Sequence, residues 1–132
     1  MKEMRRPFWE LEDPQPADIS YTLTHGSEEQ LASGIIRLAL GYPHADLVYS
    51  ELLGLVDHES ENVRSGAIIS IGHLVRRFKL LPAAAEHALQ RAHLDVSPVV
   101  RGQADAAQDD VDFAVYGDPG VLSHDDEDSV TE

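Results

Sequence analysis

Apolar residues recur at helical spacing from residue 27 onward. In residues 27–41 they fall three or four positions apart, which marks one face of a helix. Ser27 is a candidate N-cap for this helix, and Gly41 is typical of its end. The apolar face consists of Leu31, Ile35, Leu38 and Ala39.

Four further stretches show the same period, with turn residues between them. They cover residues 44–57, 60–80, 82–94 and 97–115. Ser60 and Ser97 are candidate N-caps, and Pro98 suits a first helical position because its missing N–H would have no partner there. No segment after residue 25 alternates as a strand does, so the chain is predicted to be all-α with about five helices.

The two ends of the chain differ from this pattern. Residues 1–26 contain several prolines, which interrupt helices, and we expect an irregular N-terminal cap with Phe8, Trp9 and Leu11 as an apolar plug. Within it, residues 18–24 fit either a short helix or a short strand. Residues 117–132 are rich in Gly, Ser and acids, which predicts a disordered tail behind a single helical domain at 1–116.

Short sequences repeat within the predicted helices. LASGII at 31–36 matches VRSGAI at 63–68, an offset of 32 residues. VRSGA at 63–67 matches VRGQA at 100–104, an offset of 37 residues. Periods of roughly 20–50 residues are typical of stacked arrays, in which each helical pair buries its apolar face against its neighbours.

The chain resembles the HEAT repeat family and related short HEAT-like repeats of bacterial proteins. The last unit carries the resemblance in Asp95, Pro98, Val100, Arg101 and Ala104. The middle unit carries it in Asp57, Val63, Arg64 and Ala67, with Leu52, Leu53 and Val56 on its first helix. The first unit departs from the pattern because Ala32 stands where arginine is expected. Over about residues 27–113, the resemblance implies a short right-handed α-solenoid of HEAT-like helical pairs.

The position of the two matching arginines predicts a structural role for them. Each stands at the start of an inner helix, where it can reach an aspartate in the turn of its own or the adjacent unit. We therefore expect a structural ladder that ties one layer to the next, and loss of one partner would leave an unpaired charge. The ladder residues are Asp57, Arg64, Asp95 and Arg101.

The charge of the chain is strongly lopsided. It has 24 acidic residues against 10 Lys and Arg, a formal net charge of −14. Ten of the acids lie in residues 105–132, where there is no Lys or Arg. Such a surface repels nucleic acid and anionic lipid and attracts basic partners. The chain has no cysteine, no stretch of about 20 apolar residues and no secretory signal, so we expect a soluble, cytoplasmic protein.

Three acids of the last helix share one helical face. Asp105, Asp109 and Asp112 are spaced i, i+4 and i+7, which brings like charges together at a small cost in helix stability. They predict either a docking surface for Lys and Arg of a protein partner or a solvated end face of the array. The docking surface is the interpretation we adopt.

Polar residues of the third helix are a second candidate for partner binding. Ser70, His73 and Arg77 are expected, with Asn62 and Arg37, on an inner wall opposite the deepest apolar residues. The alternative for His73 is a packing role. The basic group Arg76, Arg77 and Lys79 ends a helix, where cations suit the dipole, so nucleic-acid binding is not expected.

The sequence contains no complete pattern for a metal site or for catalysis. The deoxyhypusine hydroxylases, which are HEAT-like, bind iron through His-Glu pairs, but here only His58-Glu59 has that order, in a turn. We expect no catalytic residue, metal or cofactor. The leading hypothesis is a non-enzymatic protein-binding module, such as an immunity protein that neutralises a basic toxin or nuclease, present as a monomer or weak oligomer. The alternatives are a HEAT-like enzyme or enzyme subunit, either metal-dependent or bilin-lyase-like, and a scaffold subunit of a larger complex.

Overall fold

A computed structural model describes residues 5–117, with side chains up to Ala114. These residues form six α-helices and one short 3-10 turn, which confirms the prediction of an all-α protein. The elements are η1 (Phe8–Glu10), α1 (Pro16–His25), α2 (Glu28–Gly41), α3 (Ala45–Leu53), α4 (Glu61–Phe78), α5 (Ala83–Ala92) and α6 (Pro98–Gly117).

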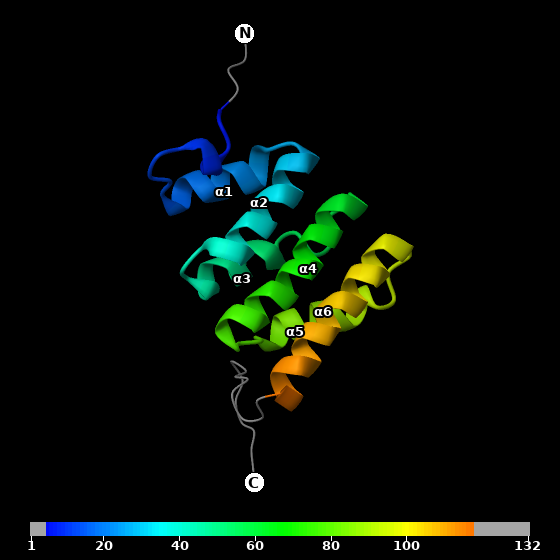
Figure 1. The fold of residues 1–132 in the computed structure, drawn as a ribbon. Coiled ribbons are helices and arrows are strands. Elements are labelled where there is room, and N and C mark those ends of the chain that lie inside the picture. The colour runs from blue at the N-terminus through cyan, green and yellow to red at the C-terminus, as the bar shows by residue number, and fades with distance from the viewer. Residues whose placement is uncertain (1–4, 118–132) are drawn as a thin grey trace.

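The helices are arranged in two layers. The helices α2, α4 and α6 lie side by side in a row, with α4 in the middle (Figure 1). Behind this row lie α3 and α5, which contact each other, while α1 packs on α2. The most extensive packing is between α4 and its two neighbours in the row, so α4 forms the centre of the domain.

Serine residues start the three helices of the row. The Oγ of Ser27 accepts the backbone N–H of Gln30 at 3.1 Å. Ser60 and Ser97 cap α4 and α6 in the same way, with backbone N–H donors 3.3 and 3.2 Å away. These bonds satisfy N–H groups that have no partner within the helix, and they fix where each helix of the row begins.

The N-terminal segment is more regular than the sequence suggests. Residues 16–25 form helix α1, so the expectation of an irregular cap across residues 1–26 is wrong for this part. Pro16 stands at the first helical position, where proline is tolerated, and the carboxylate of Asp18 accepts the backbone N–H of Gln15 at 2.9 Å. Pro16 therefore marks the start of a helix, whereas Pro7 and Pro14 lie outside the α-helices.

Glycines allow the helices of the row to approach closely. A Cβ atom at Gly66 of α4 would lie 3.0 Å from the carbonyl oxygen of Ala32 in α2. On the other side of α4, a Cβ atom at Gly72 would lie 3.0 Å from the Cα of Ala107 in α6. On both sides of α4 the helix backbones are therefore in close contact at a glycine, which holds the three helices at a fixed spacing.

The apolar faces predicted from the sequence form the core. Every residue of the α2 face is buried, and so are Val63, Ala67, Ile71 and Leu74 of α4. Phe8 is buried and Trp9 packs on the same core, as expected for the N-terminal plug. The predicted tail at 117–132 lies, beyond Gly117, outside the described residues.

Candidate functional site

An ion pair joins the start of α4 to the turn before α6. Arg64 donates from Nε to Oδ2 of Asp95 at 2.9 Å and from Nη2 to Oδ1 at 3.0 Å, which is a bidentate arrangement. Its third nitrogen, Nη1, donates to the carbonyl oxygens of His58 and Glu59 at 2.9 and 3.1 Å. Arg64 therefore holds the turn before its own helix and the turn before α6 at once.

The surroundings of this pair keep both groups charged. The hydrogen bond from Arg64 holds the pKa of the Asp95 carboxyl below its usual range, against the opposing effect of burial. The same bond raises the pKa of Arg64 above its usual value. The backbone N–H of Ser97 also donates to Asp95, at 2.9 Å. The pair is thus a charged link between the start of α4 and the turn before α6.

The other two predicted ladder residues do not form such a pair. Arg101 donates from Nη1 to the carbonyl oxygen of Asp95 at 2.7 Å, six residues before it, as Arg64 does with His58. Asp57 is 3.4 Å from Arg91 of α5, and both side chains are largely exposed. Ala32, at the position where the sequence pattern expects an arginine, carries no charge that could pair with Asp57.

Two further hydrogen bonds link the starts of α2, α4 and α6. Ser60 donates its hydroxyl to Glu28 of α2 at 3.2 Å, and Ser97 donates to Glu61 of α4 at 2.5 Å. Each serine caps its own helix and also donates to the first-turn glutamate of the neighbouring helix in the front layer, α2 for Ser60 and α4 for Ser97. In α6 the position of these glutamates is occupied by Pro98, so these contacts end there. Sequence reasoning missed these contacts, although the recurring Ser-Glu pairs were a signal for them.

The offset of 37 residues relates α4 to α6 position by position. Ser60 and Ser97 cap the two helices, Val63 and Val100 are buried in the first turn, and Arg64 and Arg101 bond equivalent carbonyls. Ile68, Gly72 and Val75 of α4 are buried, and Gly72 approaches α6. The equivalent residues of α6 are Asp105, Asp109 and Asp112, which we call the acidic row.

The acidic row is exposed along its whole length. Asp105 is 3.3 Å from Nδ1 of His93, and Asp112 accepts a hydrogen bond from Gln108 at 3.0 Å. Asp110, which the sequence did not single out, lies on the other side of α6 and pairs with Arg76 of α4 at 3.1 Å. The acidic row therefore occupies the face of α6 that points away from α4.

The polar residues of α4 are placed differently from the expectation. Ser70 is fully buried, and its hydroxyl donates to the carbonyl oxygen of Gly66 at 2.7 Å. Its assignment to a partner-binding wall is therefore wrong, because a small hydroxyl can bond within its own helix and pack in the core.

Arg77 and His73 both form hydrogen bonds with other residues of the domain, Arg77 with the end of α2 and His73 with Arg76 of its own helix. Arg77 donates to the carbonyl oxygens of Ala39 and Tyr42 at 2.8 and 2.9 Å, which holds the end of α2 against α4. Nδ1 of His73 lies 3.0 Å from Nη2 of Arg76. Burial, and then the charge of Arg76, lower the pKa of His73, so the ring is neutral and accepts this bond at neutral pH.

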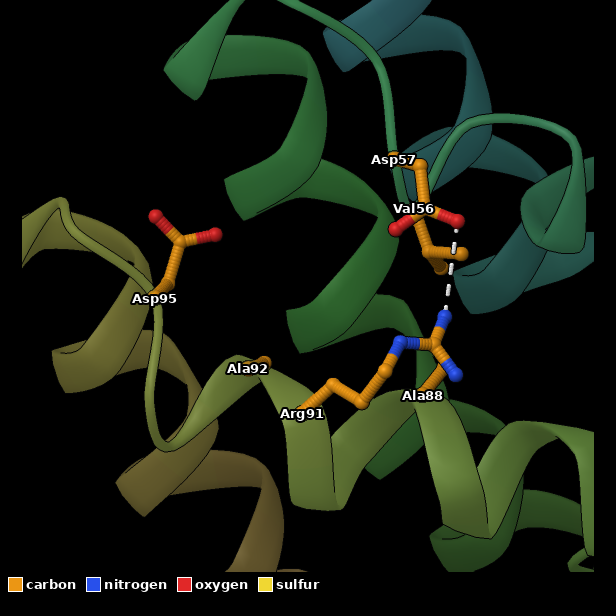
Figure 2. Close-up of a pocket in the computed structure, with 6 residues that line it drawn as sticks. All are labelled: Val56, Asp57, Ala88, Arg91, Ala92 and Asp95. Carbon is orange, nitrogen blue, oxygen red and sulfur yellow. Dashed lines mark hydrogen bonds and ion pairs between the residues drawn. The ribbon is translucent and has the colours of Figure 1, made fainter.

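A small hollow lies between the turns of the last two units. It has a volume of about 130 Å³ and is lined by Val56, Asp57, Ala88, Arg91, Ala92 and Asp95 (Figure 2). Arg91 reaches across it to Asp57, while Asp95 lies at its far side (Figure 2). The charged side chains of this lining are paired, because Asp95 is bound by Arg64 and Asp57 by Arg91.

Metal ligands do not gather in the part of the chain that the structure describes. Within residues 5–117, no group of three His, Asp or Glu side chains is placed to hold a metal ion. Nδ1 of His58 accepts the backbone N–H of Ser60 at 3.0 Å, which gives this histidine a role in the turn. Among these residues there is also no helix with the length and apolar character that crossing a bilayer requires.

Comparison with known proteins adds no further assignment. No protein-family model, curated protein or solved structure matches the chain. The candidate site must therefore be argued from the residues of this chain, and the exposed acidic row of α6 is the strongest candidate.

Proposed function

We propose that this chain is a non-enzymatic, HEAT-like protein-binding module whose acidic row docks a basic protein. One observation carries the proposal. The acidic row of α6 occupies the positions that are equivalent to Ile68, Gly72 and Val75 of α4. These three residues are buried, because α4 lies between α2 and α6. In α6 the same positions are charged and exposed.

The helix layout supports the HEAT-like part of this proposal. Three helical pairs would stack so that α2, α4 and α6 are the inner helices and α1, α3 and α5 the outer ones. The link from Arg64 to Asp95 and the two Ser-Glu contacts join consecutive units at equivalent places. In this solenoid the acidic row would form the last interface, which is open to another molecule.

Three carboxylates on this face suit a partner with Lys or Arg side chains. They would repel an apolar helix of a further unit, because each charge would lose its hydration without a counter-ion. Lys and Arg of a partner would replace that hydration with charge-assisted hydrogen bonds and would speed association at low salt. An immunity-type protein that neutralises a basic toxin or nuclease is the concrete form of this function.

The test measures binding of a basic probe to three forms of the chain. The probe is a fluorescent 18-residue peptide of Lys, Leu and Ala in scrambled order, followed by anisotropy at 50 and 300 mM NaCl. The variant Asp105→Asn/Asp109→Asn/Asp112→Asn removes the acidic row. The control, Glu12→Gln/Glu29→Gln/Asp46→Asn, removes three exposed acids elsewhere.

Loss of the acidic row should weaken binding at 50 mM NaCl by at least tenfold, on the order expected for desolvated charge pairs. The control should bind within about threefold of the unaltered chain, because both variants change the net charge equally. Equal loss in the two variants would mean that net charge alone attracts the probe, and the proposed docking surface would then be wrong.

A further inference from the structure

A second row of residues runs along α6 beside the acidic row. Val99, Ala106 and Phe113 are spaced by seven residues, which places them on one face of the helix. Val99 is 49% exposed, Phe113 is 73% exposed, and Ala106 between them is also exposed. We call these three residues the apolar row.

The two rows are neighbours on the exposed surface of α6. Asp109 is three residues from Ala106 and four from Phe113, so its carboxylate lies at the border between them. The equivalents of the apolar row in α4 are Asn62, Ile69 and Arg76, by the offset of 37 residues. The last inner helix therefore carries apolar residues at the two ends of this row, where α4 has polar ones.

The shape of this surface fits a helix. The 15 residues from Val99 to Phe113 span about 21 Å, because their 14 steps rise about 1.5 Å each, and the apolar row is narrow along that length. Gly102 lies between Val99 and Ala106, and apart from its chain neighbours and the backbone of its own helix, no atom comes within 4 Å of the place where its Cβ would be. Small residues between two larger ones leave a depression in which side chains of a second helix can pack.

Charge then selects the kind of helix. The apolar residues of the partner helix would lie on the apolar row. Residues along one edge of that apolar face would then lie opposite the acidic row. Lys or Arg at that edge would pair with the three carboxylates, whereas acids there would be repelled. We infer that α6 binds a basic amphipathic helix of another protein, with the apolar row covered by its apolar face. This inference rests on the proposed function and adds the secondary structure and the apolar contact of the partner.

The experiment compares two peptides of identical composition. One is the scrambled 18-residue Lys-Leu-Ala probe described above, and the other places its Leu residues at i, i+3, i+4 and i+7 with Lys along one edge. The scrambled peptide tests the acidic row alone, and the amphipathic one tests the further inference. The amphipathic peptide should bind on the order of tenfold more tightly and gain helical circular dichroism on binding.

Variants of the chain assign this preference to the apolar row. Val99→Ser/Phe113→Ser should remove most of the difference between the two peptides while leaving binding of the scrambled one unchanged. The control is Leu40→Ser, since Leu40 is 54% exposed on α2 and lies outside the apolar row. This control should keep the full preference for the amphipathic peptide.

Three results would overturn the inference. Equal affinity of the two peptides would show that α6 recognises charge only, and the proposed function would survive without the helix. A preference that persists in Val99→Ser/Phe113→Ser would place the helix elsewhere. Self-association of the chain in sedimentation, abolished by the same double variant, would make the apolar row an interface between copies of this chain.

Discussion

The ion pair between Arg64 and Asp95 should contribute strongly to the stability of the domain. The two side chains are only 15% and 16% exposed, and the pair is bidentate. Asp95→Ala leaves the guanidinium of Arg64 without its counter-ion in a partly buried place. Removing one member of a buried pair costs about 3–5 kcal/mol, and an exposed pair contributes at most about 1 kcal/mol. For this intermediate exposure we expect a loss of about 2–3 kcal/mol.

Arg64→Ala should cost somewhat more than Asp95→Ala. It also removes the two hydrogen bonds to the carbonyl oxygens of His58 and Glu59, together worth about 1 kcal/mol more. The double variant should lose less than the sum of the single losses, because neither charge is then left alone. We expect a coupling energy of about 1.5–3 kcal/mol from this double-mutant cycle.

Urea unfolding followed by circular dichroism at 222 nm measures these free energies. The pair of Arg91 and Asp57 is the matched control, since it also joins an arginine of a helix to an aspartate of a turn, but its side chains are 57% and 81% exposed. Its coupling energy should stay below about 1 kcal/mol. Equal coupling in the two cycles would refute the structural role of Arg64 and Asp95.

The pH dependence of the same pair gives an independent check. The pKa of Asp95 is lowered in the folded chain, so the folded state binds fewer protons than the unfolded state as the pH falls. The stabilisation is complete above the unfolded pKa, near pH 4, and is lost as the pH falls through the lower folded value. Asp95→Asn should therefore be less sensitive to acid below pH 4 than the unaltered chain.

Three further predictions concern other parts of the fold. The lowered pKa of His73 means that its protonation opposes folding, so stability should fall as the pH drops below about 6.5, and His73→Gln should reduce that fall in urea titrations at pH 7.5 and 5.5. Tyr49→Phe should cost about 1–2 kcal/mol, because the buried hydroxyl donates to the carbonyl oxygen of Leu80 at 2.5 Å; an unchanged thermal midpoint would contradict this. Asparagine at all three positions of the acidic row should raise stability by about 0.5–1 kcal/mol at low salt, because like charges three and four residues apart repel; a loss of stability would show that these acids hold the fold together.

The sequence predicts the five helices after residue 27 because each has a regular apolar face and a recognisable start. Ser27, Ser60 and Ser97 all cap the helices that follow them. It does not decide between helix and strand for residues 18–24, because a proline can either interrupt a helix or occupy its first position, as Pro16 does in α1. A helical wheel also failed for Ser70, since a serine that bonds within its own helix can be buried.

The individual contacts of the ladder depend on three-dimensional distances that a local pattern does not contain. The repeat offers no arginine to Asp57, because Ala32 stands at that position, and the contact that Asp57 makes is with Arg91 of α5, outside the repeat motif. The acidic row was visible in the sequence as three acids on one face. The offset of 37 residues pairs these acids with Ile68, Gly72 and Val75, but the burial of those three residues depends on how α4 packs in three dimensions.

The most direct test of the docking surface is an NMR titration of the ¹⁵N-labelled chain with the amphipathic peptide. Amide shifts should change along α6, with the largest changes between Val99 and Phe113, and α1 and α3 should be unaffected. These changes in the amide shifts of α6 should be absent when the three aspartates of the acidic row are replaced by asparagine. Changes spread evenly over the surface, or centred on a helix other than α6, would contradict the assignment of this face as the binding site.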